Sequence, residues 1–337
     1  MREAPPSEIG SGRLLFVGCG QLGSRHLQAA TVVPAVCEIE VVDPVPEALS
    51  TGRARVAQVA DRRTELPVRW LGALSDASRE GALCVVATQA EGRAALIAEI
   101  VETLGYRRFL LEKVVTQSVA EYERLLQLAT LHGLSIWVNC KTRAYPFHQR
   151  VKSLLDPAEP VVFTEIGGNH GLANNGVHAA DLFAFYDGGD CIDSVGSRVD
   201  AILHSSKRGP NVFDLSGTLH GSTPRGSQFT MTYQGHHLAA PTTTIATASY
   251  RCVVDQVNRW AWESDAAGGW VWRPAPFEGD LTVSNMSRAF IADILETGAC
   301  ELPTLADCAA AHRFILGELQ PHFQRLMSPS LKACPVT

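Results

Sequence analysis

A run of closely spaced glycines near the start of the chain has the spacing that suits a bound phosphate. The pattern is G-x-G-x-x-G, and its residues are Gly18, Cys19, Gly20, Gln21, Leu22 and Gly23. The first glycine permits a tight turn, the second lets the backbone approach a pyrophosphate, and the third allows a helix to pack closely on a strand. A helix that begins here also offers N–H groups and positive potential to an anion.

A carboxylate follows at the distance that ribose recognition requires. Asp43 lies twenty residues beyond Gly23, at the end of an apolar run, where it can accept hydrogen bonds from an adenosine ribose. We therefore predict that the six residues and Asp43 bind NAD, with an empty structural turn as the alternative. The charge of Asp43 disfavours a 2′-phosphate, while Arg53 and Arg55 keep NADP open. Thr88, which ends a later apolar run, is expected near the nicotinamide ribose or phosphate edge.

A lysine and a histidine further along the chain can move protons. Lys113 follows a predicted strand, at the end where open α/β sheets bind ligands, and its ammonium can polarise a carbonyl or hydroxyl. Histidine titrates near neutral pH, which suits His178 to acid–base work. If residues 174–182 form a helix, Asn174, His178 and Asp181 share one face, and Asp181 can orient the imidazole. The structural alternative is a solvated lysine, a packed histidine and a surface carboxylate.

Four further residues are candidates for the same region. Arg143 and Tyr145 follow the last predicted strand of the first half and are expected to line a substrate cleft. Arg143 could bind a carboxylate or phosphate, although arginines after a strand are also common on surfaces. Glu112 is expected to orient or support the cofactor. His170 lies in a stretch rich in glycine and asparagine, which serves either sugar binding or loop structure.

Short β-rich runs alternate with helical stretches through the first half of the chain. The predicted strands are residues 13–17, 38–42, 83–87, 108–111 and 134–138, and the predicted helices are 22–30, 93–104 and one between Ser118 and Gly133. Ser118 and Glu121 can form a capping box at the start of that last helix. The alternation predicts a Rossmann unit, a doubly wound parallel sheet.

The second half is richer in strands. The predicted strands are residues 161–166, 195–203, 229–233, 246–254 and 270–272, followed by helices at 286–297 and 305–319. We predict two domains: residues 1–140, of which 1–12 are expected to be flexible, bind the dinucleotide, and residues 141–337 bind substrate and form an oligomer. The C-terminal helix could return onto the first domain.

Several segments together resemble the glucose–fructose oxidoreductase / inositol dehydrogenase / MocA family. Glu112-Lys113-Val114 stands where that family has Glu-Lys-Pro, and the run from Arg143 to Pro146 is similar to its Arg-x-x-Pro segment. Residues 173–182 resemble its Asp-x-Gly-x-His-x-x-Asp helix, and residues 302–305 its closing "LPT" segment. The resemblance implies a C-terminal α/β domain on a large, mostly antiparallel open sheet. It also implies that one sheet face joins a homodimer or homotetramer.

The chain departs from the family pattern at two positions. Val114 replaces the proline after the lysine, and a non-proline residue seldom supports the cis peptide that the family can use there. Asn174 replaces an aspartate, and an asparagine cannot act as a general base. These departures keep open a regulatory protein that binds a dinucleotide or sugar without catalysis.

Composition excludes several other classes of protein. The 337 residues carry a net charge of −6 and no long basic run, so we expect no nucleic-acid partner. No segment has the roughly 20 apolar residues of a membrane helix, and the first residues lack the apolar region of a signal peptide, so we expect a cytoplasmic protein. The nine scattered cysteines are expected to pack as thiols. His236-His237 is interpreted as a polar strand end, and we predict no bound metal.

The leading hypothesis is an NAD(P)-dependent dehydrogenase or reductase that acts on a small molecule, a sugar or sugar derivative. A pattern in residues 168–182 resembles a family branch associated with bacterial surface-sugar biosynthesis, alongside nonulosonic acid pathways. The alternatives are the regulatory protein and a reductase for the imine or enone group of a non-sugar metabolite.

Overall fold

The computed structural model describes residues 12–236 and 239–337, and the chain forms two compact units. Unit 1 comprises the residues up to Glu112, Arg124–Asn139 and Asp280–Leu305, and unit 2 comprises Lys113–Glu123, Cys140–Gly279 and Ala306–Thr337. Residues 1–12 were expected to be flexible, and all of them except Gly12 lie outside the described residues. In the described ranges, no helix has both the length and the apolar character needed to cross a bilayer.

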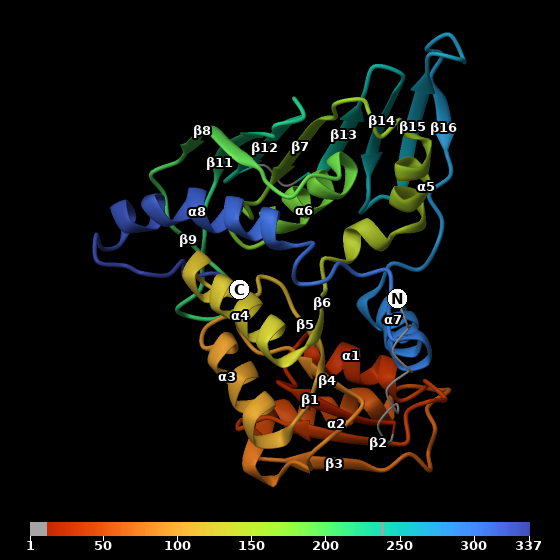
Figure 1. Cartoon of the computed structure of the whole chain (residues 1–337), viewed down its shortest axis with the longest axis vertical. Coiled ribbons are helices and arrows are strands. Elements are labelled where there is room, and N and C mark those ends of the chain that lie inside the picture. The colour runs from red at the N-terminus through yellow and green to blue at the C-terminus, as the bar shows by residue number, and fades with distance from the viewer. Residues whose placement is uncertain (1–11, 237–238) are drawn as a thin grey trace. The chain divides into compact units, whose positions relative to one another are not determined.

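Unit 1 contains a six-stranded parallel sheet (Figure 1). Its strands lie in the order β3-β2-β1-β4-β5-β6, which is the doubly wound dinucleotide-binding order. The strands are β1 (Arg13–Val17), β2 (Glu38–Val42), β3 (Val68–Leu71), β4 (Leu83–Val86), β5 (Arg108–Leu111) and β6 (Ser135–Val138). The predicted Rossmann sheet is confirmed.

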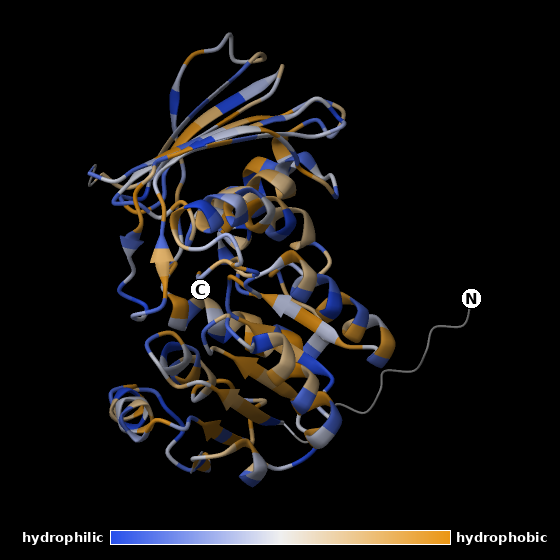
Figure 2. Ribbon diagram, turned by 90° about the vertical axis from the view of Figure 1, so that its left-hand side faces the viewer, coloured by the Kyte–Doolittle hydropathy of each residue, from blue (hydrophilic) through white to orange (hydrophobic). Residues whose placement is uncertain are grey.

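The strands β1 and β4 of unit 1 form because consecutive apolar residues can be buried on both faces of a sheet. All four residues of β4 are buried, as are the last four of β1, which is the pattern of a parallel sheet covered on both faces. Figure 2 shows these strands coloured as hydrophobic. The helices that accompany them are α1 (Gly23–Ala30), α2 (Pro46–Ala57), α3 (Arg93–Glu99), α4 (Val119–His132) and α7 (Val283–Thr297).

Helix α4 begins at a local capping signal, whereas helix α7 joins unit 1 from a distant part of the chain. At the start of α4 the N–H of Glu121 donates to Ser118 Oγ at 3.3 Å, as the capping box predicts. The first five residues of α4 belong to unit 2 and the rest to unit 1. α7 comes from far along the chain and packs beside α1.

Unit 2 is built on an eight-stranded sheet in the order β16-β15-β14-β13-β7-β12-β11-β8. Only the β7–β12 pair is parallel among these described strands, so the predicted large, mostly antiparallel sheet is confirmed. The strands are β7 (Val162–Gly168), β8 (Asp193–Val199), β11 (Gly217–Ser222), β12 (Gln228–Gln234), β13 (Thr242–Ala246), β14 (Tyr250–Asp255), β15 (Trp260–Asp265) and β16 (Arg273–Ala275). A separate pair joins β9 (His204–Ser205) to β10 (Phe213–Asp214).

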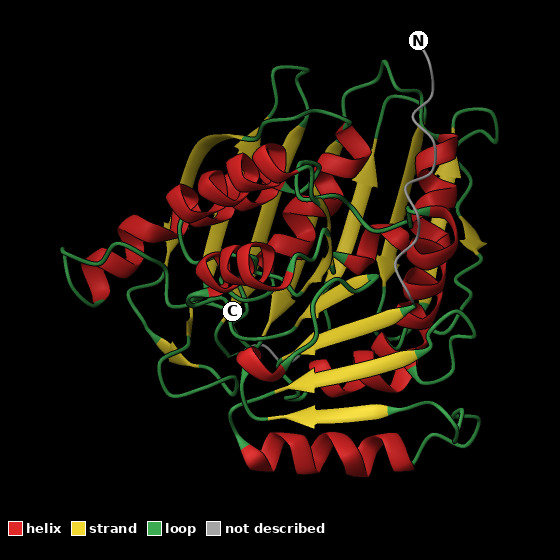
Figure 3. Ribbon diagram, turned by 60° about the horizontal axis from the view of Figure 1, so that its bottom comes forward, coloured by secondary structure: helices red, strands yellow, loops and turns green. Residues whose placement is uncertain are grey.

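Helices pack on one face of this sheet (Figure 3). They are α5 (Pro146–Leu154), α6 (Gly176–Asp187) and α8 (Ala309–Leu326), and α6 packs against α8 and β12. The side chains of the opposite face are exposed, and they include Val162, Ile166 and Trp262 at 50%, 54% and 44%. Because side chains alternate along a strand, the residues between them point to the helical face.

Two strand predictions in unit 2 were wrong. The run 246–254 is not one strand: it spans the last residue of β13, a turn at residues 247–249, and most of β14. Ser249 donates from its N–H and its hydroxyl to the distant Glu159 carboxylate, at 3.0 and 2.8 Å, which stabilises a turn that lacks glycine and proline. The run 270–272 is the link between β15 and β16, because Gly268 and Gly269 reverse the chain and the Trp270 N–H donates to Asp265 O at 2.9 Å. Tertiary contacts outweigh β-propensity at both places.

Candidate functional site

The glycine loop of unit 1 has the geometry that its spacing predicts. Gly18 has a φ of +91°, and a Cβ added there would lie 2.9 Å from the Ala87 carbonyl carbon. A Cβ on Gly23 would lie 2.0 Å from Gly18 O, so only glycine allows this turn to close onto α1. A Cβ on Gly20, by contrast, would meet no heavy atom within 4 Å. The loop therefore has an open surface beside its middle glycine, which suits the approach of a pyrophosphate.

Asp43 lies directly against this loop. It follows β2 and is 8% exposed; its Oδ2 accepts from the Cys19 N–H at 2.7 Å and its Oδ1 from the Val45 N–H at 2.9 Å. A carboxylate has about four acceptor positions, so the group can still accept from ribose hydroxyls. Arg55 is bonded to the loop itself, through Gln21 O at 2.9 Å. The loop, the start of α1 and Asp43 together fit a dinucleotide.

A buried arginine links the ends of two neighbouring strands in unit 1. Arg93, 1% exposed, donates from Nη1 to Glu112 O at 2.5 Å and from Nη2 to Thr88 O. Burial lowers the pKa of Arg93 to about 10. The main chain at Thr88 and at Glu112 is thus held at the carboxyl edge of the sheet, where this fold binds ligands. Sequence reasoning missed Arg93, although a cation opening an otherwise apolar helix was a signal.

The Glu112 side chain is the centre of a second buried network in unit 1. Its Oε1 accepts from Asn139 Nδ2 at 2.7 Å and lies 2.7 Å from His26 Nε2, and His26 Nδ1 lies 2.8 Å from Ser287 Oγ. These partners come from α1, α7 and the residue after β6. The geometry suits the supporting role predicted for Glu112, which stays a prediction.

Lys113 and the start of α6 meet within unit 2. The Lys113 ammonium donates to the main-chain oxygen of Asn174 at 2.7 Å, four residues before His178. The Lys113–Val114 peptide is cis, so the expectation drawn from Val114 was wrong. Both residues are buried.

The helical face predicted to carry Asn174 together with His178 was also wrong. α6 begins at Gly176, so Asn174 precedes the helix and shares no helical face with His178. Its Nδ2 donates to Phe213 O at 2.6 Å and its Oδ1 accepts from the Thr337 N–H at 2.9 Å. Asn174 is 2% exposed, and its side chain holds two distant segments together, while its predicted role toward a substrate stays a prediction.

Asp181 and Arg143 form a buried ion pair. Arg143 donates from Nε to Asp181 Oδ2 at 2.9 Å and from Nη2 to Oδ1 at 2.6 Å, a bidentate geometry. The sequence did not predict this pairing, and the site roles expected for Asp181 and Arg143 stay predictions. Cys140 and Cys308 lie close to Asp181: the two sulfur atoms and a carboxylate oxygen of Asp181 all lie within 4.8 Å of one another, as the ligands of a metal ion would. The cluster does not fit a metal ion, because Arg143 neutralises Asp181 and burial raises the pKa of Cys308.

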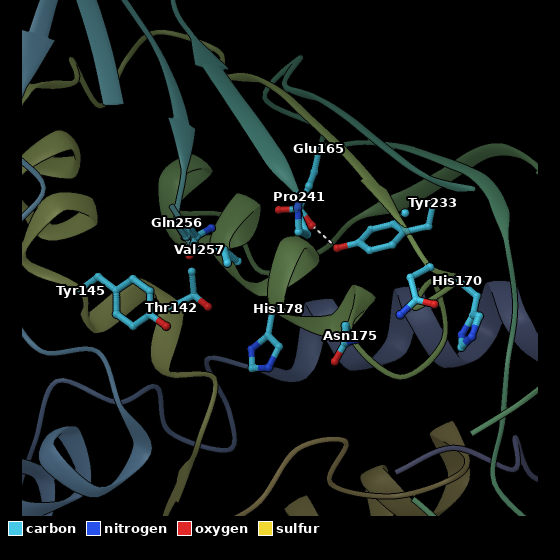
Figure 4. A pocket seen from close by; sticks show the side chains of 12 residues that line it. Thr142, Tyr145, Glu165, His170, Asn175, His178, Tyr233, Pro241, Gln256 and Val257 are labelled. Carbon is cyan, nitrogen blue, oxygen red and sulfur yellow. Dashed lines mark hydrogen bonds between the residues drawn. The ribbon is translucent and has the colours of Figure 1, made fainter. Parts of the chain in front are cut away.

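Unit 2 contains a polar cavity of about 330 Å³ on the helical face of its sheet. Its walls come from strands, from the start of α6 and from the segment before α5, as Figure 4 shows. Three predicted residues line it: Tyr145, His170 and His178. The other lining residues are Thr142, Glu165, Gly168, Asn169, Asn175, Tyr233, Pro241, Gln256 and Val257. Gly168, Asn169 and Asn175 lie in the glycine- and asparagine-rich stretch for which sugar binding was one expectation, and sequence reasoning missed the others.

Burial keeps the two tyrosines of this lining neutral, since it raises the pKa of Tyr233 as well as that of Tyr145. Burial raises the pKa of Tyr145 to about 12, and the ring stacks on His148 at 6.0 Å between centroids. His148 lies behind the cavity in the core, where burial lowers its pKa to about 3. His170 stacks on His204 at 4.7 Å. His236-His237 was interpreted as a polar strand end, and His237 lies outside the described residues.

Glu165 is the acidic group of the cavity lining. It lies on β7, is 5% exposed, and accepts from the Tyr233 hydroxyl at 2.6 Å and from the Thr243 hydroxyl at 2.8 Å. Figure 4 shows the Glu165–Tyr233 bond. Burial raises the pKa of Glu165. The sequence signal for this site was a carboxylate at a position of a predicted strand whose side chain faces the core.

Comparisons with known proteins show likeness of fold. No protein-family model and no curated protein matches the chain by sequence. An oxidoreductase from Agrobacterium radiobacter, crystallised with NAD⁺, L-tartaric acid and magnesium, matches with a TM-score of 0.71 at 13% identity, over 90% of this chain and 94% of that chain. The UDP-N-acetylglucosamine 3-dehydrogenase GnnA from Acidithiobacillus ferrooxidans matches with 0.69 at 16%, over 94% and 98%.

A third match is the WlbA dehydrogenase from Bordetella pertussis, in complex with NADH and UDP-GlcNAcA. Its TM-score is 0.65 at 17% identity, over 91% of this chain and 94% of that chain. The likeness is one of fold. At these identities the two-unit architecture is shared over nearly the whole chain, while activity and substrate are not carried across.

Proposed function

We propose that this chain is an NAD(P)-dependent oxidoreductase acting on a sugar or sugar derivative, with the dinucleotide bound by unit 1 and the substrate by unit 2. The observation that carries the proposal is the glycine loop, in which Gly18 and Gly23 are sterically required while Gly20 faces open space beside Asp43. A structural turn has no need of that open middle position. The similar folds support the proposal, since one of those proteins was crystallised with NAD⁺ and another with NADH and UDP-GlcNAcA, and a third is a UDP-N-acetylglucosamine 3-dehydrogenase.

Two side chains of unit 2 are proposed to handle the proton. A bound nicotinamide supplies the acceptor or donor of the hydride. When an alcohol becomes a carbonyl, the hydroxyl proton must leave, and His178, half-buried in the cavity lining, can hold it on an imidazole nitrogen. Lys113, whose ammonium is kept at the start of α6 by Asn174 O, can stabilise the charge that develops on the reacting oxygen. In the reverse direction the same groups return the proton.

The exposed face of the eight-stranded sheet is proposed to join copies of the chain into a dimer or tetramer. Ile166 and Val162 on β7 and Trp262 on β15 are about half exposed there. Large apolar side chains gathered on one sheet face are typical of an interface.

The proposal is tested by binding and turnover together. NADH and NADPH are titrated by calorimetry, and absorbance at 340 nm is followed with NAD⁺ and a panel of sugars. The variants are Lys113→Met and His178→Asn, with Lys332→Met and His132→Asn as controls distant in sequence. We expect turnover to fall at least 100-fold in the first pair and to stay within twofold in the controls. Absence of dinucleotide binding would refute the proposal, and binding without turnover on any sugar would favour the regulatory protein.

A further inference from the structure

The charge of the cavity in unit 2 restricts what it can bind. Apart from the Glu165 carboxylate, the polar side chains among its twelve described lining residues are amides, hydroxyls and imidazoles, and none of these twelve residues is an arginine or a lysine. Arg143, which the sequence suggested as a ligand for an anionic group of the substrate, forms an ion pair with Asp181 and is not among the residues that line the cavity. Apart from Lys113 at the start of α6, a phosphate or carboxylate inside this cavity would therefore find no guanidinium or ammonium partner among these lining residues.

Glu165 supplies the opposite charge, and the fold positions it closely. Each carboxylate oxygen accepts from one hydroxyl, Tyr233 on β12 and Thr243 on β13, the two strands that flank β7. Gly167 makes room for the Tyr233 ring, because a Cβ there would lie 2.7 Å from that ring. The carboxylate is thus held in one orientation at the cavity wall.

No cationic group of the described residues lies within ion-pair distance of this carboxylate. The arginine, lysine and histidine nitrogens within 4.0 Å of a carboxylate all pair with other acids. A buried carboxylate without a cation is costly, because the loss of hydration is only partly offset by two hydroxyl donors. A cationic ligand would remove that cost.

We propose that the substrate of this cavity is a sugar bearing a protonated amino group, and that Glu165 is the partner of its ammonium. This inference rests on the proposed function and names the substrate class of that site. The other polar groups of the lining, among them Asn175, His178 and Gln256, suit the ring hydroxyls. The alternative is a neutral sugar bound by a protonated Glu165, and the two differ in whether replacing a hydroxyl by an amine raises affinity.

The test compares sugars that differ only in that group. Binding of D-glucosamine, 3-amino-3-deoxy-D-glucose and 6-amino-6-deoxy-D-glucose is measured by calorimetry against D-glucose, for the full chain with and without NADH. The variant is Glu165→Gln, which keeps the size and hydrogen-bonding atoms but removes the charge. Glu296→Gln, at an exposed position of α7, is the matched control.

We expect at least one amino sugar to bind tenfold or more tightly than glucose, and Glu165→Gln to abolish that preference while glucose binding changes less than threefold. Equal affinity for amino sugars and glucose in the unaltered chain would overturn the inference, whatever the variant does. A preference that persists in Glu165→Gln would also overturn it. NADH binding is read in the same experiments, so failure of the proposed function is seen as lost dinucleotide affinity and is distinguished from failure of ammonium recognition.

Discussion

Substitution of the middle glycine of the loop separates cofactor binding from folding. Gly20→Val adds three carbons at a position where a Cβ would meet no heavy atom within 4 Å, and where φ does not lie in the left-handed region. The folded chain without cofactor should therefore tolerate valine, with a change in unfolding free energy of about 0.5 kcal/mol or less, as for other exposed positions.

The effect on cofactor binding is expected to be far larger. The added carbons would occupy the space through which a pyrophosphate reaches the N–H groups of the loop and of the first turn of α1. Loss of two charge-assisted hydrogen bonds, at roughly 1.5–3 kcal/mol each, amounts to about 3–6 kcal/mol. Since 1.4 kcal/mol corresponds to a factor of ten, the affinity for NADH should fall by at least about 100-fold.

Calorimetric titration with NADH and thermal unfolding are measured on the same preparations. Gly317→Val serves as the control, because Gly317 lies in α8 of unit 2 and a Cβ there also meets nothing within 4 Å. We expect unchanged NADH affinity in the control and unchanged unfolding without cofactor in Gly20→Val. NADH affinity within threefold of the unaltered chain in Gly20→Val would refute the reasoning that the loop holds a pyrophosphate.

Three further predictions concern unit 2. His148 is buried with a pKa of about 3, against about 6.5 in the unfolded chain, so its contribution to stability is complete above pH 6.5 and should decline as the pH falls toward 3. Urea unfolding at pH 7.5 and 5.0 should show this decline in the free energy of unfolding. An equal decline in His148→Gln would contradict the prediction. Asn174→Ala loses bonds to Phe213 and Thr337 and should lower the unfolding free energy by about 2 kcal/mol, measured in urea, whereas a purely catalytic role predicts no change. Ile166→Glu should convert an oligomer to monomers in light scattering, and an unaltered mass would exclude this face as the interface.

Local sequence was a sound guide wherever a short segment determines its own structure. The ends of β1, β2 and β5 coincide with the predicted runs, and in β1 and β5 the reason is that a buried parallel strand needs consecutive apolar residues. The glycine loop was likewise readable, since a positive φ at Gly18 and close packing at Gly23 are properties that only one residue type supplies.

The roles of individual polar side chains in unit 2 could not be read in the same way. Asn174, His178 and Asp181 have helical spacing, yet the helix begins after Asn174, and Asp181 bonds to Arg143, 38 residues earlier in the chain. Spacing specifies which residues can share a face, but a buried polar group takes whichever partner the packed segments bring to it.

By itself, the sequence determined the Rossmann unit, its glycine loop with Asp43, and the presence of a second unit rich in strands, because these follow from periodicity and residue type over short distances. Only the tertiary structure decided that Glu165 and Tyr233, 68 residues apart, meet at one cavity wall through the parallel pairing of β7 and β12. It also decided that Arg143 and Asp181 neutralise each other. Both results depend on contacts between distant segments, which a linear pattern does not contain.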